Sequence, residues 1–539
     1  MKIIGLDFGT TNSTISFIKH DSDTPESFKR GAAANDYIPS VVSYNKGDNH
    51  DISIGDTAKM KIASKDFDVY ENFKLRLGKN FDRKNENESK TPIQVTHDFF
   101  KNLLDIYKKS QHIDGIDRIV MTVPEIWFRE ESNRTAGENI EGIFEELGYS
   151  DFELHSEPVA AAAYFRWAFE HNKESNPEGN KYNGFITVID YGGGTLDVTL
   201  CEAMDDDTIK ILERCGFGEY NDTNGCAGVA FDEAVIEKLI RDKGLSISKD
   251  SKKFITLRNK FEEWKIKDCD NITKYMKYYY DDPALVKGKP LFSLEYNEDG
   301  ETMDVHCDDL DWCFNKVNAP QLRKSLEQVK QYFQAHKIDD SAQENFKVLL
   351  VGGFSNFIVV EKEVRAFFGS TMEDDIDERF KQPFPIVDRA LSISKGAARI
   401  AKGSDRIITT CTHSYGYITF AIGESDQVVD NYVQVIEKGT DIKELVNSVF
   451  AKDPVQVKNK TGKISIFIDD GRADHKGRLR KTLYESTGEL FPNIDDKNNE
   501  YYIGFSVNKN QIPTIHIKDK HDNVKSTSLS KLFEGITVA

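Results

Sequence analysis

Two segments of the chain carry the same order of apolar and polar positions. Residues 3–14 read IIGLDFGTTNST and residues 186–197 read ITVIDYGGGTLD. In each, a short apolar run leads to an aspartate (Asp7 or Asp190), an aromatic residue and a turn rich in glycine and threonine, and a second apolar run follows. An apolar run, a glycine turn and another apolar run predict a β-hairpin. Two related hairpins predict a duplicated domain with a cleft between its halves.

The composition of these turns predicts what the cleft holds. Glycine allows positive φ and a close approach of the backbone, so successive N–H groups can point at phosphate oxygens. Threonine hydroxyls add donors, and an aspartate at the end of each first strand can hold Mg²⁺ or its waters. One hairpin from each half therefore predicts a nucleotide polyphosphate bound from two sides. The alternative is a pair of ordinary glycine-rich hairpins.

A third glycine turn lies in residues 346–357, FKVLLVGGFSNF. An apolar strand runs into Gly352 and Gly353, and helical spacing of apolar residues follows. Such a turn can lie against a base and ribose. Earlier in the chain, residues 258–269 (RNKFEEWKIKDC) predict a helix with Glu262 and Lys265 on one face, where a solvated ion pair is expected.

The sequence does not support the catalytic motifs of other enzyme classes. Asp7-Phe8-Gly9 matches the DFG motif of protein kinases, but no room precedes it for a glycine loop and a catalytic loop. The sequence has no GxxxxGK[ST] loop, no GxGxxG between a strand and a helix, and no HExxH among its 12 histidines. It also lacks a nucleophile elbow for Ser-His-Asp hydrolysis.

Charge and cysteine content narrow the class of protein. The 539 residues carry 71 basic and 90 acidic side chains, a net charge of −19, without a long basic run. Such a chain is not expected to bind nucleic acid or anionic membranes. Seven cysteines without a CxxC pair favour free thiols in a reducing compartment. No apolar run approaches the roughly 20 residues of a membrane span, and the N-terminus predicts a strand, so a cytoplasmic protein is expected.

The C-terminal third has a different pattern. Residues 413–436, 455–468 and 501–518 alternate polar and apolar positions, and turn residues such as Gly423, Gly462 and Asn508 separate them. This alternation predicts a β-sandwich. A small sandwich can hold an extended peptide through backbone hydrogen bonds and a side-chain pocket. The alternative is an inert structural sandwich.

A series of motifs supports a family assignment. LDFGTTNS, YIPSVVSY, FKLRLGKNF, IVMTVPEIWF, SEPVAAAAYF, IDYGGGTLDV, GVAFD, LLVGGFSN and SKGAARIA occur in this order. The series resembles the heat-shock protein 70 (DnaK-type) chaperones from residue 1 to about residue 403, and more faintly to about residue 520. The resemblance implies an α/β fold: a two-lobed actin-like ATPase of duplicated ribonuclease H-like domains over 1–403, with lobes of roughly 1–183 and 184–403. A β-sandwich over 404–539 would follow, similar to the β part of the family's substrate-binding domain.

The resemblance also implies cofactors and site residues. The implied cofactors are ATP or ADP, Mg²⁺ and K⁺, with catalytic roles for Lys74, Glu157, Asp190 and Thr195. The implied metal ligands, mostly through waters, are Asp7, Asp190 and Asp197. The implied nucleotide-binding residues are Gly9, Thr10, Thr11, Asn12, Gly192, Gly193, Gly194, Thr195, Gly228, Glu262, Lys265, Cys269, Gly352, Gly353, Phe354, Asn356 and Asp388. Lys74 would offset charge at the γ-phosphate. Glu157 would orient the attacking water, or else serve only as an acidic residue at a helix N-terminus.

The sequence departs from the family at the nucleotide. Ile266 and Asn356 stand where members usually place two arginines against adenine. The usual Gly-Gly-Glu-Asp-Phe-Asp reads AGVAFD over residues 227–232, without two of its acidic residues. Each lost cation contact is worth on the order of 1 kcal/mol, so weaker nucleotide affinity is expected.

The C-terminal third departs as well. The connecting segment GSDRIITTCTHSYG lacks the family's leucine-rich stretch, and the chain ends at LSKLFEGITVA without the sequence of a helical lid. A peptide held without a lid is expected to leave quickly.

Several functions remain open from the sequence. The first is a monomeric, slowly ATP-hydrolysing chaperone-like protein whose nucleotide state is coupled to binding of extended or unfolded polypeptide, with a cochaperone or exchange factor as a further partner. The second is a non-hydrolysing nucleotide sensor that acts as an exchange-factor-like partner of a chaperone. An actin-like filament protein and a sugar kinase are weaker alternatives.

Overall fold

The computed structural model describes most of the chain. The described residues are 2–30, 36–62, 64–78, 81–85, 88–129, 131–218, 226–339, 341, 344–372, 377–385, 388–411, 413–422, 428–456, 464–473, 479–486, 491–492, 500–508 and 513–528. The chain forms two compact units. Unit 1 contains Met1–Trp127, Thr135–Ile209 and Glu213–Arg406, and unit 2 contains Phe128–Arg134, Lys210–Leu212 and Ile407–Ala539.

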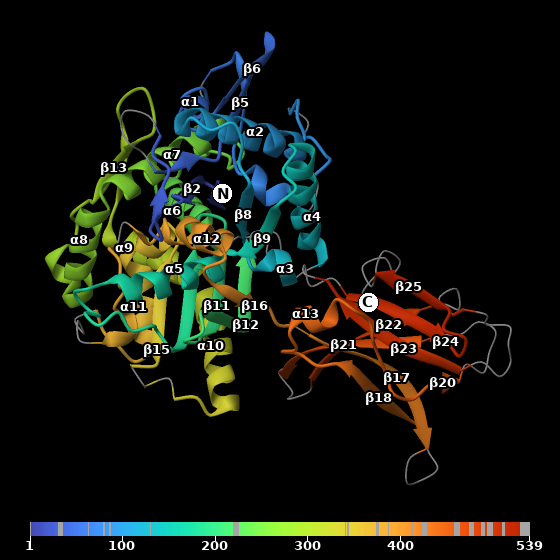
Figure 1. Cartoon of the computed structure of the whole chain (residues 1–539). Helices are drawn as coiled ribbons and strands as arrows, with labels where there is room; N and C mark the ends of the chain where they lie inside the picture. Colours follow the sequence, from blue (N-terminus) through green and yellow to red (C-terminus); the bar gives the residue numbers. More distant parts are fainter. Residues whose placement is uncertain are drawn as a thin grey trace. The chain divides into compact units, whose positions relative to one another are not determined.

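Unit 1 is built on two sheets of the same plan (Figure 1). The first sheet has the order β3-β2-β1-β8-β9, with β4 beside β2. The second has the order β15-β10-β11-β12-β16. The strands of the first sheet are β1 (Ile3–Asp7), β2 (Asn12–Ile18), β3 (Pro25–Ser27), β4 (Ile38–Pro39), β8 (Arg118–Val123) and β9 (Phe152–Ser156). Those of the second are β10 (Gly184–Tyr191), β11 (Thr195–Ala203), β12 (Thr208–Gly218), β15 (Phe346–Val351) and β16 (Arg406–Ile408).

The strand pairing confirms the predicted repeat. β1 pairs antiparallel with β2 and parallel with β8. β10 likewise pairs antiparallel with β11 and parallel with β15. Each of the two similar segments therefore forms a hairpin, and each hairpin sits in the centre of its own sheet. We call the two halves the first and the second lobe.

Two helices of small residues pack closely in unit 1. They are α5 (Glu157–His171) and α12 (Ser392–Lys402), which lie against each other (Figure 1). A Cβ on Gly396 would lie 1.7 Å from the carbonyl oxygen of Ala160, so only glycine allows this approach. Gly5 of β1 meets the backbone of Ala398 in the same way, at 2.1 Å. The residue range of α12 was expected in the second lobe, but this helix packs on β1, β2 and β8 of the first sheet.

Helix α2 (Pro92–Gln111) shows how local sequence anchors the first turn of the site. Thr91 caps the helix by accepting a hydrogen bond from the Gln94 backbone N–H at 3.3 Å, and the Thr91 N–H donates to the Gln94 side chain at 3.0 Å. Its apolar face buries Phe99 and Phe100 against Phe8, whose ring centroid lies 4.8 Å from that of Phe100. This packing fixes Phe8 at the end of β1.

The remaining elements of unit 1 flank these sheets. Two small sheets are β6-β5-β7 and β13-β14. The strands are β5 (Val42–Asn45), β6 (Asp48–Ile54), β7 (Phe67–Tyr70), β13 (Phe292–Glu295) and β14 (Thr302–Val305). The helices are α1 (Asp56–Lys59), η1 (Phe73–Arg76), α3 (Ile126–Arg129), α4 (Glu131–Glu146), α6 (Gly228–Asp242), α7 (Lys252–Lys267), α8 (Cys269–Asp281), η2 (Pro283–Leu285), α9 (Cys307–Val317), α10 (Ala319–His336), η3 (Phe354–Asn356), α11 (Ile358–Phe367) and η4 (Glu378–Phe380).

Unit 2 contains two antiparallel sheets, in the orders β18-β17-β21-β22 and β19-β23-β24-β25, with β20 beside β23. Tyr417 and Ile466 of one sheet share a buried core with Ile503, Phe505 and Ile515 of the other. The predicted β-sandwich is therefore confirmed. Its elements are β17 (Ser414–Ile422), β18 (Val428–Ile436), α13 (Ile442–Leu445), β19 (Val449–Phe450), β20 (Val455–Gln456), β21 (Ile464–Ala473), β22 (Leu479–Ser486), β23 (Glu500–Val507), β24 (Pro513–Asp519) and β25 (Val524–Ser528). The expected turns at Gly423 and Gly462 and the segment LSKLFEGITVA lie outside the described residues.

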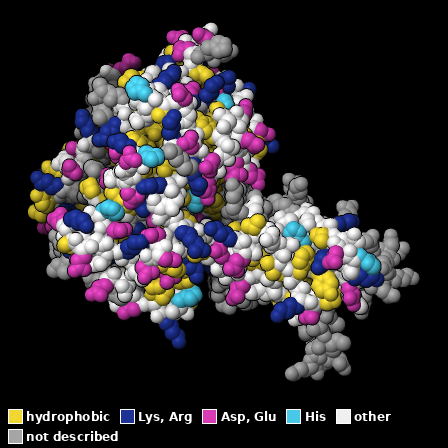
Figure 2. Space-filling view, in the orientation of Figure 1, with side chains coloured by type: hydrophobic (Ala, Val, Ile, Leu, Met, Phe, Trp, Pro, Cys, Tyr) yellow, Lys and Arg dark blue, Asp and Glu magenta, His cyan; other side chains and the backbone are white. Residues whose placement is uncertain are grey.

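The described surface mixes charges of both signs. On the face drawn in Figure 2, lysine and arginine side chains are interspersed with aspartate and glutamate side chains. No broad basic area is visible among the described residues of that face.

Candidate nucleotide-binding site

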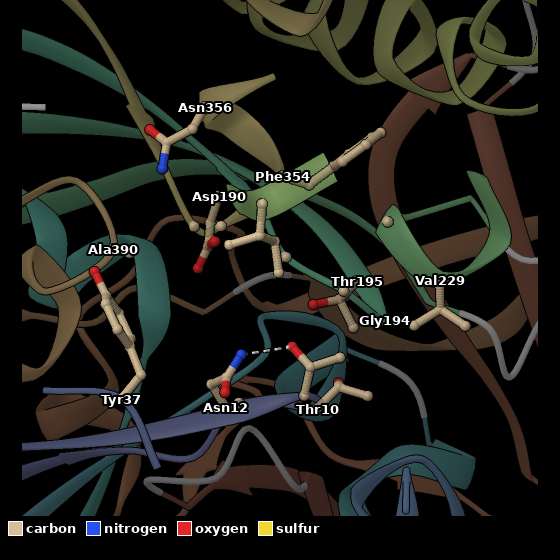
Figure 3. A pocket seen from close by; sticks show the side chains of 18 of the residues that line it. Thr10, Asn12, Tyr37, Asp190, Gly194, Thr195, Val229, Phe354, Asn356 and Ala390 are labelled. Atoms are coloured by element: carbon tan, nitrogen blue, oxygen red, sulfur yellow. Dashed lines mark hydrogen bonds between the residues drawn. The ribbon is translucent and has the colours of Figure 1, made fainter. Parts of the chain in front are cut away.

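The two predicted phosphate turns face each other across the cleft of unit 1 (Figure 3). One turn joins β1 to β2, and the other joins β10 to β11. A Cβ on Gly193 would lie 2.8 Å from the Thr11 side chain, and a Cβ on Gly194 would lie 2.6 Å from Thr10 Oγ1. Glycine is therefore required here by the close approach of the two turns. Backbone N–H groups of both lobes can reach one ligand in this space.

Helix α6 supports the second turn. The backbone N–H of Gly228 donates to the carbonyl oxygen of Gly192 at 3.1 Å, and that of Val229 donates to the carbonyl of Gly193 at 2.8 Å. These bonds fix the carbonyls of Gly192 and Gly193 on the N-terminus of α6. The Val229 side chain lines the cavity at the position where the family usually has an acidic residue.

Three buried aspartates gather below the turns. Asp7 ends β1, and Asp190 lies directly opposite Asp197 in the β10–β11 pair. Residues directly opposite in an antiparallel pair place their side chains on the same face, and like charges in that arrangement repel. Thr122 of β8 donates its hydroxyl to Asp7 Oδ1 at 3.3 Å. The site thus holds carboxylates from both lobes in one buried volume.

Burial and mutual repulsion raise the pKa of each of these carboxyl groups. Desolvation, followed by the charge of Glu157, raises the pKa of Asp7 to about 7, although Lys74 lowers it. Desolvation, followed by Glu157 and the neighbouring aspartates, holds the pKa of Asp190 well above its usual range. The pKa of Asp197 is raised by desolvation and then by Glu157. A bound cation would relieve this repulsion.

Lys74 and Glu157 form an ion pair in the same buried volume. Lys74 Nζ lies 2.8 Å from Glu157 Oε1 and also donates to the carbonyl oxygen of Phe8. Both side chains are almost fully buried. Lys74 comes from η1, and Glu157 is the first residue of α5. Glu157 therefore occupies a helix N-terminus and also belongs to the buried site.

The third glycine turn forms another wall of the cavity. Gly352 has φ of +81°, and a Cβ there would lie 2.4 Å from Asp190 Oδ1. Phe354 and Asn356 of η3 follow, and both line the cavity (Figure 3). The Cys269 thiol donates to the carbonyl oxygen of Asn356 at 3.8 Å, which joins α8 to this wall. The predicted strand, glycine turn and helix are confirmed.

Lys265 differs from the expectation of an ion pair with Glu262. Lys265 instead pairs with Asp232 of α6, which is buried, and its Nζ lies 5.2 Å from the centre of the Phe354 ring. Burial raises the pKa of Asp232 to about 7, and the charge of Lys265 counteracts this rise. The pair joins α6 to α7 at the edge of the cavity.

The cavity of ≈ 320 Å³ brings most of the predicted site residues together. The predicted residues that line it are Asp7, Gly9, Thr10, Thr11, Asn12, Lys74, Glu157, Asp190, Gly192, Gly193, Gly194, Thr195, Gly228, Glu262, Lys265, Cys269, Gly352, Gly353, Phe354 and Asn356. Asp197 and Asp388 are the exceptions. Asp197 is fully buried, and Asp388 accepts a hydrogen bond from Tyr164 at 2.8 Å and pairs with Lys395 at 2.8 Å.

The sequence does not mark several lining residues, including Tyr37, Ala390 and Ile393. Tyr37 also lines an adjoining cavity of ≈ 410 Å³, together with Glu71 of the first lobe and Arg258 of the second. Desolvation, followed by the charges of nearby aspartates, raises the pKa of Tyr37 to about 12. Tyr37 lies in an irregular segment before β4, so no periodicity marks it as a lining residue.

The carboxylates suit a hard divalent cation. Asp190 Oδ2 is buried and makes no hydrogen bond among the described residues, so this oxygen is available to a ligand. Mg²⁺ prefers carboxylate oxygens together with waters and phosphate oxygens. Asp7 and Asp190, which line the cavity from opposite lobes, would hold such an ion or its waters. A bound Mg²⁺ supplies positive charge to a polyphosphate.

These features define a two-lobed actin-like ATPase domain, with its cleft between two phosphate hairpins, followed by a β-sandwich. The model of the family described as Hsp70 protein matches residues 3–102 and 83–379 of this chain. The chain belongs to the Hsp70 family.

Family membership supports a nucleotide-binding chaperone in general. Members of the Hsp70 family are generally ATPases that use ATP and ADP with Mg²⁺, and they generally bind unfolded polypeptides and cochaperones. Within the described part of the chain, no helix is long and apolar enough to cross a membrane.

Proposed function

We propose that this protein binds ATP with Mg²⁺ and K⁺ between its two phosphate turns and hydrolyses it slowly. The observation that carries the proposal is the meeting, in one cavity, of two glycine turns, two carboxylates from opposite lobes and the Lys74–Glu157 pair. Phosphoryl transfer depends mainly on positioning and on electrostatic stabilisation of the transferred group. In this cavity the two glycine turns would position the phosphates, and Lys74 would stabilise their charge.

The roles of individual residues follow from their positions. Lys74 Nζ, held by Glu157 and by the Phe8 carbonyl, is a positive charge at the base of the cavity that would stabilise negative charge at the terminal phosphate. Glu157 would accept a hydrogen bond from the attacking water and orient it. Thr195, at the start of β11, would contribute its hydroxyl to the terminal phosphate.

We further propose that nucleotide state is coupled to binding of an extended polypeptide by the β-sandwich. The support is family membership and the two-sheet architecture of unit 2. ATP would accelerate release of the peptide, and a cochaperone or exchange factor would act on the cycle. Cys201, Cys269, Cys307 and Cys313 are free thiols, which fits a cytoplasmic location.

A non-hydrolysing nucleotide sensor is the second candidate function. The specific observation in its favour is Val229, which puts an apolar side chain where an acidic residue is usual beside the second phosphate turn. Such a protein would bind ATP and a partner chaperone without turnover.

One assay separates the two functions. Radiolabelled ATP is incubated with the wild-type protein and with Lys74→Ala, and both bound nucleotide and released phosphate are measured. Binding together with phosphate release that depends on Lys74 supports the ATPase. Binding with phosphate release at background in both proteins supports the sensor, and no binding contradicts both functions.

A further inference from the structure

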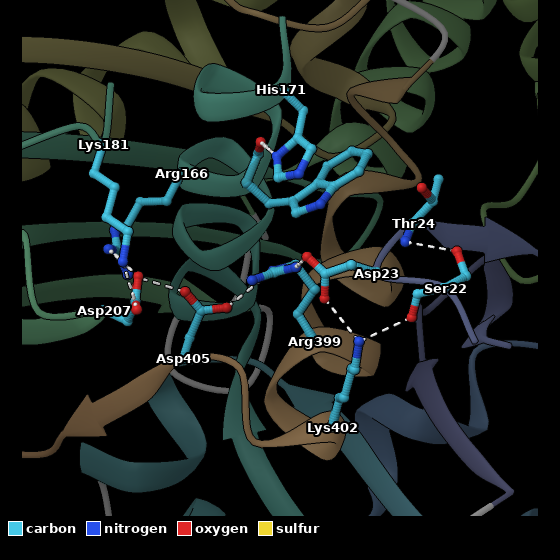
Figure 4. A network of polar contacts seen from close by, with 11 residues as sticks. Ser22, Asp23, Thr24, Arg166, His171, Lys181, Asp207, Arg399, Lys402 and Asp405 are labelled. Atoms are coloured by element: carbon cyan, nitrogen blue, oxygen red, sulfur yellow. Dashed lines mark hydrogen bonds and ion pairs between the residues drawn. The ribbon is translucent and has the colours of Figure 1, made fainter. Parts of the chain in front are cut away.

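Five charged side chains of alternating sign form a continuous chain in unit 1. The order is Asp23, Arg399, Asp405, Arg166 and Asp207 (Figure 4). Asp405 accepts from Arg399 Nε at 3.0 Å and from Arg166 Nη1 at 3.0 Å, one arginine on each of its two oxygens. Arg399 Nη1 lies 3.2 Å from Asp23 Oδ2, and Arg166 Nη2 lies 3.1 Å from Asp207 Oδ1.

The two ends of this chain occupy equivalent places in the two lobes. Asp23 lies in the connection between β2 and β3, and Asp207 lies in the connection between β11 and β12. β2 begins at Asn12 of the first phosphate turn, and β11 begins at Thr195 beside the second. Each terminal aspartate therefore holds the far end of a strand whose near end borders the nucleotide cavity, about 20–30 Å away at the usual rise of a strand.

The centre of the chain is buried, whereas its ends reach solvent. The side chains of Arg166, Asp405 and Arg399 are 5%, 2% and 8% exposed, and those of Asp207 and Asp23 are 44% and 47% exposed. Arg166 comes from α5 and Arg399 from α12, the two closely packed helices. Asp405 thus places a carboxylate between two buried guanidinium groups, and without its charge these groups would repel each other.

Further contacts strengthen both ends. Lys402 Nζ donates to Asp23 Oδ1 and to the Ser22 carbonyl, each at 2.8 Å. Lys181 Nζ donates to Asp207 Oδ2 at 2.7 Å. Each terminal aspartate is therefore held by two cations, and Asp405 joins these two pairs of cations through Arg399 and Arg166.

We propose that Asp405 is a positioning residue for the nucleotide site. Through Arg399 and Arg166 it fixes the far ends of the two phosphate hairpins relative to each other, and so sets the distance between the two phosphate turns. This inference rests on the proposed binding of nucleotide between those turns. Loss of the Asp405 charge would let α5 and α12 separate. Both phosphate turns would then bind the nucleotide more weakly.

The test compares Asp405→Asn with Asp377→Asn in the full-length protein. Asp377 is a matched control because its Oδ2 lies 2.7 Å from Arg379 Nη2, both side chains are buried, and the pair lies within one short segment of the second lobe. The measurements are the dissociation rate of a fluorescent ADP analogue with Mg²⁺ and the melting temperature of each variant. We expect both variants to melt earlier, and only Asp405→Asn to release ADP about tenfold faster.

Two variants at the exposed ends of the network test the same inference if Asp405→Asn does not fold. Asp23→Asn and Asp207→Asn change half-exposed side chains, so both should fold, and each should release ADP roughly two- to threefold faster than the wild type. Salt should accelerate release from the wild type by screening these exposed ends, and less so from the two variants.

The outcomes separate this inference from the function on which it rests. Faster release from the network variants than from Asp377→Asn supports it. Equal release rates in Asp405→Asn and Asp377→Asn, or wild-type rates in Asp23→Asn and Asp207→Asn, would overturn the inference while leaving nucleotide binding intact. Failure of the wild type to bind ADP would overturn both.

Discussion

Lys74 Nζ and Glu157 Oε1 lie 2.8 Å apart in a volume that solvent hardly reaches. The two residues are far apart in the sequence, and they come from η1 and from the N-terminus of α5. A buried ion pair of this kind contributes little net stability, because the loss of hydration offsets the attraction of its charges. Its position beside three buried carboxyl groups is better explained by a role with a ligand.

Lys74→Ala should leave nucleotide bound and lower phosphate release by about 100-fold, as expected when one preorganised charge is removed from a phosphoryl-transfer site. The variant should also lose stability, by about 3–5 kcal/mol, because Glu157 becomes an unpaired buried charge. Steady-state phosphate release and chemical denaturation measure the two effects.

Two further variants separate turnover from stability in that experiment. Lys74→Met combined with Glu157→Gln removes both charges, so it should recover stability without recovering turnover. Lys347→Ala is the control, since Lys347 is also a buried lysine but bonds the Glu378 carbonyl and does not line the cavity. Equal turnover in the wild type and Lys74→Ala would remove Lys74 from the mechanism.

Gly194→Ala should weaken ADP binding. The new Cβ would lie 2.6 Å from Thr10 Oγ1 and 2.8 Å from Leu75 Cδ2, so the two phosphate turns would have to separate. Overpacking of this kind costs about 1–3 kcal/mol, or roughly a 5- to 150-fold loss of affinity. Titration calorimetry measures it, with Gly115→Ala as the control because nothing lies within 4 Å of its added Cβ. Equal affinities of the two variants would contradict the close approach of the turns.

The Asp232 carboxyl group should make the stability of the protein fall between about pH 4 and pH 7. Burial raises its pKa from 3.8 to about 7, so the folded protein binds a proton more tightly than the unfolded chain does. The stability contributed by this group is therefore fully present below pH 3.8 and is lost as the pH rises through about 7.

Denaturation of Asp232→Asn across this pH range is the measurement, and the variant should show a smaller fall. Asp377→Asn is a control of opposite sign. The hydrogen bonds and the charge of Arg379 lower the pKa of Asp377 despite its desolvation, so its contribution is lost as the pH falls. Parallel pH profiles of the wild type and Asp232→Asn would refute the assignment.

Introducing arginine at positions 266 and 356 should tighten ATP binding. Ile266 is 63% exposed and Asn356 lines the same cavity, so each position has room for a longer side chain near the base. A guanidinium over an aromatic ring gains about 0.5–1 kcal/mol at an exposed site, or roughly two- to fivefold in affinity. Calorimetry with ATP tests this, and Met60→Arg is the control because Met60 is 84% exposed and lines neither cavity. An equal gain in all three variants would indicate a general effect of charge.

The sequence predicts those parts of the site that depend on a local pattern of residues. The hairpins that end at Asp7 and Asp190 need only apolar runs and glycine turns, and the alternation after residue 413 likewise predicts the sandwich. The partner of Lys265 could not be predicted, because Glu262 is near in sequence whereas Asp232 reaches it from another helix. The lining position of Tyr37 was missed for a related reason, since it depends on how an irregular segment crosses the cleft.

The placement of α12 shows a further limit. Its sequence follows the second sheet, but Gly396 and Ala398 fit against α5 and β1 of the first lobe. Small residues at these positions permit close packing, yet the sequence does not say which surface they meet. Long-range packing of this kind is decided by the whole unit rather than by a local pattern.

The decisive experiment measures the release rate of a fluorescent apolar peptide with ATP, with ADP and without nucleotide. Phosphate is assayed in the same samples. If nucleotide state is coupled to peptide binding, we expect faster peptide release with ATP than with ADP, together with slow phosphate production that Lys74→Ala lowers strongly. Peptide release that is the same in all three conditions, or no peptide binding while ATP is still bound, would contradict a coupled ATPase and would leave a nucleotide-binding protein without this chaperone cycle.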